Sequence, residues 1–335
     1  MPFTQPRRLS AVLAAGLGVV LSAGVLVQPA QAAGTPAQGT YQLNYTSLYS
    51  GQSVTITEKS LTGNEDNSLQ YRLVDWGENS GAVTFLQPGE TSAKHTYTEL
   101  GSHRVTVALT DRDGNTSGNF VGGNTVTVTK VTGSYKLSAG TTWRGPSTTL
   151  PVSLSLAGVP SNVNQVRVGW DDGTVSSVSR TTRGVAHRFA YSGAHKVTVS
   201  LVNGAGQSAP LTVGTVNVKL DYTNPTIKIT TPAKSNRGTS WKTIRGTAAD
   251  AGAGASRVAI VVGQVRGTTT YYFNGTKWVR GSIDKSKVRY GTVKNGKWSV
   301  KIATPKKGYL IIGYVAVDKV GNSSYAKSKQ VKLTR

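Results

Sequence analysis

The sequence predicts an all-β protein, built as a row of β-sandwich domains behind an N-terminal leader. Three observations predict this fold class. No long stretch repeats its apolar residues with the period of a helix. Several short segments alternate apolar residues with Thr or Ser, which turns one face of a strand inward and the other outward. One stretch of about 90 residues recurs at a constant spacing, which indicates a duplicated domain.

The N-terminus has the pattern of a secretory signal. Arg7 and Arg8 precede an uncharged run that ends near Val27, and small residues two apart follow. This order predicts a signal peptide over the first 32 residues, with cleavage between Ala32 and Ala33. The apolar run is also close to the length of a membrane span, so a retained anchor is the alternative. Only that alternative brings the chain to a membrane, and both place the remainder outside the cytoplasm, secreted or associated with the cell surface.

Cysteine is absent from the chain. This excludes disulfides, thiol nucleophiles and cysteine-ligated metals. Together with the Ala-rich leader, it is typical of exported bacterial proteins.

After a short linker at residues 33–39, the duplication divides most of the chain. Residues in the two copies lie 94 apart and then, after a two-residue deletion, 92 apart. The matched pairs are Tyr41 with Tyr135, Gly51 with Gly145, Trp76 with Trp170, His95 with His187 and His103 with His195. We therefore expect two homologous domains at residues 40–131 and 132–221. In the first, Ser53–Thr57, His103–Thr110 and Thr125–Thr129 have the alternation of strands.

The repeated motifs resemble the PKD (polycystic-kidney-disease) domain family. They are Trp76-Gly77-Glu78 followed by His95-Thr96-Tyr97, and Trp170-Asp171-Asp172-Gly173 followed by His187-Arg188-Phe189. The resemblance covers about residues 40–220. It implies an immunoglobulin-like β-sandwich, used in extracellular proteins as a spacer or as a contact module for proteins or sugars. It says little about activity, because such folds host many functions.

Residues 222–335 depart from the repeat but have the same strand-like alternation. They resemble a bacterial immunoglobulin-like domain of the type found in surface and secreted proteins, through Pro225-Thr226-Ile227-Lys228-Ile229 and Ala316-Val317-Asp318-Lys319-Val320-Gly321-Asn322. Asn274-Gly275 and Asn295-Gly296 each lie between strand-like segments. Asn-Gly suits turns in which both central residues need positive φ, so each pair predicts a hairpin.

One turn pattern recurs in all three domains. Residues 111–115, 203–207 and 318–322 each begin with Asp or Asn and have Gly three residues later. A side-chain oxygen can cap such a turn, and Gly can adopt its left-handed conformation. We expect these to be hairpin turns between the last two strands of each sandwich.

The candidate chemistry is sparse. The four histidines occupy duplicated positions, which favours scaffold roles over catalysis or metal binding. Asp111, Asp113 and Asn115 have the alternate spacing of a calcium loop, but Gly114 stands at the fourth place and no acid follows at the twelfth; a turn is the favoured interpretation and a weak calcium site the alternative. Adjacent Asp171 and Asp172 would point to opposite faces of a strand, so they make a poor hydrolytic pair. We expect no enzyme, no cofactor and no metal.

The net charge of each domain is the strongest indication of what the protein binds. The three domains carry 6 Lys+Arg against 9 Asp+Glu, 8 against 3 and 22 against 3, which gives −3, +5 and +19. The electrostatic field of the third domain, with its net charge of +19, attracts polyanions. Because export argues against a native nucleic-acid partner, an anionic cell-wall or extracellular polysaccharide is the expected one, with a protein partner as a further option. The candidate contacts are Lys277, Trp278, Arg280, Lys285, Lys287, Arg289, Lys294 and Lys297.

The tryptophans divide into two groups. Trp76 and Trp170 are expected to fill the centres of their sandwiches. Trp278, beside Tyr271, Tyr272 and Phe273, is either a core residue or part of a contact surface. The leading hypothesis is a non-enzymatic secreted or surface protein, with two spacer or contact modules and a basic third domain that binds an anionic polymer. The alternatives are a carbohydrate-binding accessory protein that uses exposed aromatics, and an extracellular hydrolase with an unrecognised site.

Overall fold

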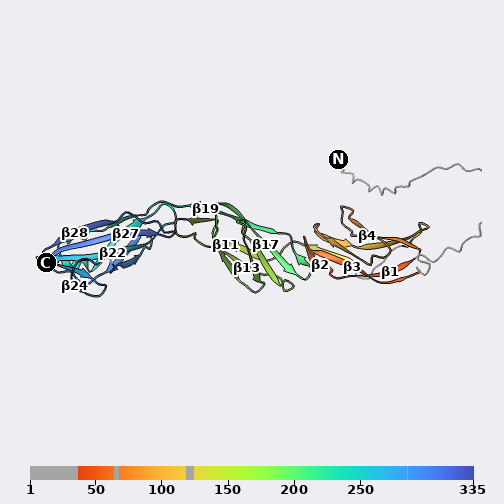
Figure 1. Cartoon of the computed structure of the whole chain (residues 1–335), viewed down its shortest axis with the longest axis horizontal. Coiled ribbons are helices and arrows are strands. Elements are labelled where there is room, and N and C mark those ends of the chain that lie inside the picture. Colours follow the sequence, from red (N-terminus) through yellow and green to blue (C-terminus); the bar gives the residue numbers. More distant parts are fainter. Residues whose placement is uncertain (1–36, 64–67, 118–123, 285) are drawn as a thin grey trace, which may run out of the picture.

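The structure, a computed structural model, describes residues 37–335 except 64–67, 118–123 and 285. The signal peptide and its cleavage site at Ala32 and Ala33 lie outside these residues. The described chain is all-β: it forms three immunoglobulin-like β-sandwiches in a row, as Figure 1 shows. Each sandwich is made of strands that pair only with one another among the described residues.

The first sandwich takes residues 38–129. One sheet has the order β1-β3-β6, with β1 Gln38–Leu43, β3 Ser53–Thr62 and β6 Ser92–Thr96. Opposite it lie β2-β10-β7 and β5-β4-β8-β9, with β2 Ser47–Tyr49, β4 Leu69–Asp75, β5 Val83–Leu86, β7 Gly101–Arg104, β8 Thr106–Asp111, β9 Thr116–Ser117 and β10 Thr125–Thr129. Only Val105 separates β7 from β8, so the two short sheets follow one another along the chain.

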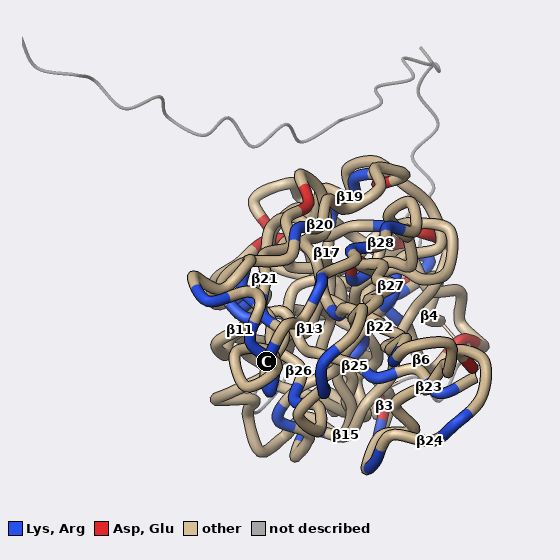
Figure 2. The backbone as a smooth tube through the Cα atoms, turned by 90° about the vertical axis from the view of Figure 1, so that its left-hand side faces the viewer, with Lys and Arg blue, Asp and Glu red and all other residues tan. Residues whose placement is uncertain are grey.

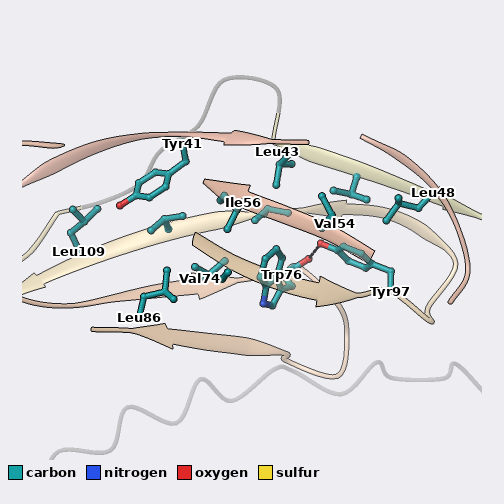
Figure 3. Close-up of a cluster of buried hydrophobic side chains, with 14 of the residues drawn as sticks. Tyr41, Leu43, Leu48, Val54, Ile56, Val74, Trp76, Leu86, Tyr97 and Leu109 are labelled. Atoms are coloured by element: carbon teal, nitrogen blue, oxygen red, sulfur yellow. Dashed lines mark hydrogen bonds between the residues drawn. The ribbon is translucent and has the colours of Figure 1, made fainter. Parts of the chain in front are cut away.

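Alternating residues of these strands form the first core, drawn in Figure 3. Val54 and Ile56 of β3 face Val74 of β4, and all three are almost completely buried. Trp76 is 0% exposed. Its indole N–H donates to Thr84 Oγ1 at 2.9 Å, and its carbonyl accepts the Tyr97 hydroxyl at 2.8 Å. The burial of Trp76 is what the sequence predicted, and replacing a buried tryptophan with Ala typically costs about 3–5 kcal/mol.

The second sandwich takes residues 134–220 and repeats this plan. Its sheets are β11-β13-β16 and β12-β19-β17-β14-β15, with β18 paired to β17. The strands are β11 Ser134–Leu137, β12 Thr141–Arg144, β13 Val152–Ala157, β14 Gln165–Gly169, β15 Val175–Ser179, β16 Gly184–His187, β17 Gly193–Asn203, β18 Gly206–Gln207 and β19 Leu211–Leu220. Trp170 is 0% exposed, like Trp76, and its indole N–H donates to Ser176 Oγ at 2.9 Å.

The third sandwich takes residues 226–333. Its sheets are β20-β21-β26 and β24-β23-β22-β27-β28, with β25 also paired to β22. The strands are β20 Thr226–Ile229, β21 Thr243–Ala249, β22 Ala255–Arg266, β23 Thr269–Phe273, β24 Trp278–Arg280, β25 Arg289–Thr292, β26 Lys297–Lys301, β27 Gly308–Asp318 and β28 Lys327–Leu333. A short 3₁₀ helix, η1 Gly238–Trp241, precedes β21. None of the helical structure in the described part of the chain is long and apolar enough to cross a membrane.

The two Asn-Gly hairpins differ in their backbones. Asn295 and Gly296 both have positive φ, at 50° and 72°, as the sequence predicted. At the other turn the predicted hairpin also forms, because β23 pairs antiparallel with β24, but only Gly275 has positive φ, at 109°. The loop there is longer, and the Asn274 side chain closes it by accepting the N–H groups of Thr276 and Lys277.

The first joint interlocks the cores of two sandwiches. Ala205, at the tip of the 203–207 turn, belongs to the first core, and Tyr49 of β2 belongs to the second. The Ser53 N–H donates to the Ala205 carbonyl at 3.2 Å, and the Ala209 N–H donates to the Ser50 carbonyl at 2.6 Å. We call residues 203–207 and 318–322 the docking turns, because the second one forms a joint in the same way.

At the second joint, Val320 lies at the tip of its docking turn and is 0% exposed. Its carbonyl accepts the Ser147 N–H at 3.1 Å, and Asn322 Nδ2 donates to the Asp221 carbonyl at 2.9 Å. Gly145 faces Val320, where a Cβ would collide with the valine side chain. Its repeat partner Gly51 faces the first joint, where a Cβ would collide with the backbone of Ala209. The repeated glycine is therefore a position of close approach between neighbouring sandwiches.

The equivalent turn of the first sandwich, residues 111–115, is not docked in this way. Asp113 stands where the docking turns have Ala205 and Val320, and it is exposed. Asp111 Oδ1 accepts the N–H groups of Asp113 and Asn115, at 2.9 and 2.8 Å. Asp111 Oδ2 accepts Asn115 Nδ2 at 2.9 Å, and this side-chain hydrogen bond is the main cause that lowers the pKa of Asp111. The turn that joins β8 to β9 is thus capped by its own first residue.

Candidate functional site

Lysine and arginine dominate the surface of the third sandwich. Figure 2 looks along the molecule from the end that carries this sandwich, and shows far more basic than acidic positions. Among residues 222–335 the acids are only Asp250, Asp284 and Asp318. The candidate functional site is therefore sought where these cations share one face.

The cations predicted from the sequence do not lie on one pair of neighbouring strands. Lys277 and Arg280 belong to the β23–β24 hairpin of the larger sheet. Arg289 begins β25, which pairs with β22 of the same sheet, and its guanidinium lies beside Gly275. Lys294 and Lys297 flank the next turn and lead into β26, which belongs to the opposite sheet.

The predicted segment thus crosses from one sheet to the other. The side chains of Lys277, Arg280, Lys287, Arg289, Lys294 and Lys297 are all exposed. Lys285 lies outside the described residues. The segment brings the Arg289 guanidinium to the turn that precedes Lys277, but places Lys297 on the other sheet.

Trp278 is half-buried and is not a free stacking platform. Its indole N–H donates to the Ala303 carbonyl at 3.0 Å, and the ring packs against the third core. The Arg266 guanidinium carbon lies 5.7 Å from the Trp278 ring centre and 4.3 Å from that of Tyr271. The aromatic cluster is therefore covered on one side by the protein's own arginine.

A second set of cations does share one face. In β20, β21 and β26, every other residue points outward from the sheet, and four of these outward residues are basic. We call them the basic face: Lys228, Arg245, Lys297 and Lys301. All four are exposed, and they alternate with inward core residues such as Ile244, Trp298 and Val300.

The register of the three strands sets the spacing of this face. Lys228 and Lys297 both lie opposite Thr247, on its two sides, whereas Arg245 lies opposite Ser299. Neighbouring strands are about 4.8 Å apart, and outward residues of one strand are about 7 Å apart. The basic face is therefore a two-dimensional array of cations separated by hydroxyl side chains.

A hollow of about 330 Å³ opens at the edge of the basic face. It is lined by Arg245, Thr292, Lys294, Lys297, Trp298 and Ser299. Three cations and two hydroxyls supply only donors or neutral acceptors at its rim. Such a lining suits an anionic group, and a guanidinium can bind it through two parallel hydrogen bonds.

Lys228, Arg245 and Lys301 were not among the residues predicted from the sequence. The predicted cations lie within one window of 21 consecutive residues, 277–297, whereas the basic face is formed by three strands that are far apart in the chain. The signal is present as the alternation of cations with core residues in Thr226–Ile229, Thr243–Ala249 and Lys297–Lys301.

Three carboxylates meet at the second joint. Asp221, Asp250 and Asp318 each offer one oxygen, and these atoms all lie within 4.8 Å of one another. Asp221 follows β19, Asp250 follows β21, and Asp318 ends β27 and begins the docking turn. No sequence pattern indicates this group, because the three positions are widely separated in the chain.

The histidines are parts of the two scaffolds. His95 stacks on Trp76 with ring centres 4.9 Å apart, and His187 stacks on Trp170 at 4.6 Å. His95 Nε2 lies 3.0 Å from a Glu78 oxygen. In the second sandwich, His187 Nε2 lies 2.7 Å from a fully buried Asp172 oxygen.

The environment of Asp172 explains its acidity. Burial alone would raise the pKa of this carboxyl. Hydrogen bonds from Thr174, His187 and the Ala190 N–H outweigh burial and lower the pKa of Asp172 to about 2. The carboxylate is therefore tied into the turn that the PKD resemblance singled out.

The other two histidines each place their two ring nitrogens against two backbone carbonyl oxygens. His103 lies between the carbonyl oxygens of Gly77 and Glu99, at 3.3 and 2.9 Å. In the second sandwich, His195 lies between those of Asp171 and Tyr191, at 3.0 and 3.1 Å. The duplicated geometry supports a scaffold role for the pair.

Comparisons with known proteins leave the family open. No family model and no curated protein matches the chain. A solved structure of fibronectin(III)-like modules of Clostridium thermocellum CbhA is 16% identical, covers 54% of this chain and 94% of its own, and gives a TM-score of 0.25. A structure described as carbohydrate-binding modules from the β-sandwich superfamily is 11% identical, covers 87% of this chain and 99% of its own, and gives a TM-score of 0.26. The assignment of an immunoglobulin-like fold rests on the strand pairing of the chain itself.

Proposed function

We propose that the protein is a non-enzymatic spacer that presents its third sandwich to an anionic extracellular polymer. The observation that carries the proposal is the basic face, where four cations point outward from one three-stranded sheet. The polymer of a bacterial cell wall or an acidic polysaccharide has the matching chemistry, since its repeating anions can occupy several cations at once.

The first two sandwiches serve as spacers in this proposal, and we propose that they are PKD-like modules. Both joints bury apolar side chains and add backbone hydrogen bonds, which favours a row of fixed spacing over a flexible string. We also propose export through the predicted signal. N-terminal sequencing of the secreted protein should then begin at Ala33, whereas a retained Arg7 would indicate an anchor.

The test measures binding of the full chain to dextran sulfate, with uncharged dextran as the control polymer. Affinity for dextran sulfate should fall steeply with salt, because binding to a polyanion releases its condensed cations. Binding to both polymers with no dependence on salt would contradict the proposal and favour contact through exposed aromatics.

Two matched variants locate the contact. The first changes Lys228, Arg245, Lys297 and Lys301 to Gln, and the second changes Lys277, Arg280, Lys287 and Arg289 to Gln. Both remove four charges, so they reduce the overall field equally. Exposed charges are each worth about 0.2–1 kcal/mol, so four together are worth about 0.8–4 kcal/mol. The first variant should therefore lose between about fourfold and several hundredfold in affinity, and the second clearly less. Equal losses would contradict the assignment of the basic face, and no loss in either would contradict the proposed function.

A further inference from the structure

The acids at the second joint form an unusual group. Residues 221–335 contain only four acids, and three of them, Asp221, Asp250 and Asp318, place an oxygen within 4.8 Å of one another. Asp221 is 2% exposed and Asp318 is 3% exposed. Like charges at this distance repel one another strongly where solvent is excluded.

Their hydrogen bonds leave one oxygen without a partner. Asp221 accepts the N–H groups of Thr223 and Ala253, and Asp318 accepts those of its own docking turn together with Asn322 Nδ2. Asp250 is half-buried as a residue, and its Oδ2 accepts two backbone N–H groups. Its Oδ1 is sealed from solvent and accepts no hydrogen bond from the described residues. A buried, unpaired carboxylate oxygen is costly unless a cation balances it.

No basic side chain in the described part of the chain forms an ion pair with this group. The described basic side chains that lie within ion-pair distance of a carboxylate are Arg72, His95 and His187, all in the first two sandwiches. The three carboxylates therefore lack a partner of opposite charge, although the surrounding sandwich is strongly basic. Lysine and arginine are abundant here, yet none of those that the structure describes forms an ion pair with the group.

The chemistry of the oxygens indicates the class of cation. The three oxygens lie within 4.8 Å of one another, a separation that one Ca²⁺ can span, since two oxygens at a Ca–O distance of 2.3–2.6 Å are at most about 4.6–5.2 Å apart. An all-carboxylate set is typical of a hard divalent cation. Mg²⁺ usually keeps several waters and binds only one or two carboxylates, so a set of three protein carboxylates favours Ca²⁺.

We propose that Asp221, Asp250 and Asp318 bind one Ca²⁺ at the joint between the second and third sandwiches. The ion joins three segments: the linker after β19, the end of β21 and the docking turn after β27. Backbone carbonyls or water complete its coordination. Binding rigidifies the joint, because the docking turn and the linker then coordinate the same ion. This inference does not rest on the proposed binding of an anionic polymer.

The test is a calcium titration of the full chain by calorimetry, with thermal unfolding as a second measurement. We expect one Ca²⁺ per chain and a rise in Tm of the third sandwich of several °C once Ca²⁺ is about a hundredfold above Kd. Mg²⁺ should bind at least about tenfold more weakly. No heat and no change in Tm up to about 10 mM Ca²⁺, beyond the range of extracellular sites, would overturn the proposal.

The Asp250→Asn variant makes the test specific. Asn keeps an oxygen for the N–H groups of Gly252 and Gly254 but removes the charge. In EDTA the variant should be at least as stable as the wild type, because repulsion is relieved. With Ca²⁺ the order should reverse, and affinity should fall at least about tenfold. Unchanged affinity would overturn the proposal.

Asp111→Asn is the matched control, since Asp111 caps the equivalent turn of the first sandwich but belongs to no such group among the residues that the structure describes. It should lower Tm through the weaker cap and leave calcium binding unchanged. Calcium binding that is lost in Asp111→Asn and kept in Asp250→Asn would place the ion in the first sandwich and overturn the proposal. If Asp250→Asn does not fold, Asp221→Asn tests the same oxygen set.

Discussion

Gln52→Ala should loosen the first joint. Gln52 is 1% exposed, and its Nε2 donates across the joint to Asn203 Oδ1 at 2.8 Å and to the Gly206 carbonyl at 2.7 Å. Its Oε1 accepts the Tyr49 N–H at 2.9 Å. Each hydrogen bond contributes about 0.5–1.5 kcal/mol, and the groups left behind are partly buried, so the joint should lose about 3 kcal/mol. That corresponds to roughly a hundredfold more frequent opening.

Amide hydrogen exchange of the full chain measures this opening directly. The Ser53 and Ala209 N–H groups donate across the joint, so their protection should fall by about two orders of magnitude in Gln52→Ala. Gln207→Ala is the matched control, because Gln207 is exposed and, among the described residues, its side chain hydrogen-bonds to Arg167 of its own sandwich alone. There the two amides should change by less than about threefold. If both amides exchange as slowly in Gln52→Ala as in the wild type, the reasoning about the joint is wrong.

Three further predictions concern the first two sandwiches. Replacing His95 and His187 with Asn should change stability by at most a few kcal/mol in chemical unfolding and leave dextran sulfate binding intact; stoichiometric zinc uptake by the wild type that the mutants lose would contradict the scaffold role. Because the pKa of Asp172 is lowered to about 2, its contribution to stability is present above about pH 4 and is lost as pH falls toward 2, so Asp172→Asn should flatten the acid-unfolding curve over that interval, which circular dichroism can follow. Glu58→Gln should cost about 3–5 kcal/mol in urea unfolding, because it leaves the 1%-exposed Arg72 without its 2.7 Å partner; a cost below about 1 kcal/mol would show that water reaches the arginine.

The local parts of the fold could be predicted from the sequence. Trp76 and Trp170 are buried as their repeat positions indicated, and the strand alternation placed Val54 and Ile56 inward correctly. These features depend on residues near in sequence or on the constant offset. The hairpin predicted at Asn274-Gly275 forms, but Asn274 itself does not have positive φ, because the loop length and not the dipeptide alone sets the turn type.

The joints and the charged sites could not be predicted in the same way. The repeated pair Gly51 and Gly145 was visible, but its cause lies in Ala209 and Val320, which approach only when the next sandwich docks. The carboxylate group likewise forms only because β21 and β27 end at the same end of the third sandwich, where the linker from the second sandwich enters it. The basic face depends on register, because one residue of slip would turn Arg245 into the core.

The parallel pairing of the second strand with the last strand in each of the first two sandwiches has a mechanical consequence. In the first sandwich β2 runs parallel to β10, and in the second β12 runs parallel to β19. In a parallel pair, tension between the start of one strand and the end of the other acts along the strands and shears their hydrogen bonds together instead of opening them one at a time. A chain held at one end by its third sandwich would therefore resist extension through short patches near its joints, and its lifetime under load would follow the unfolding rate of these patches more than the equilibrium stability of the cores.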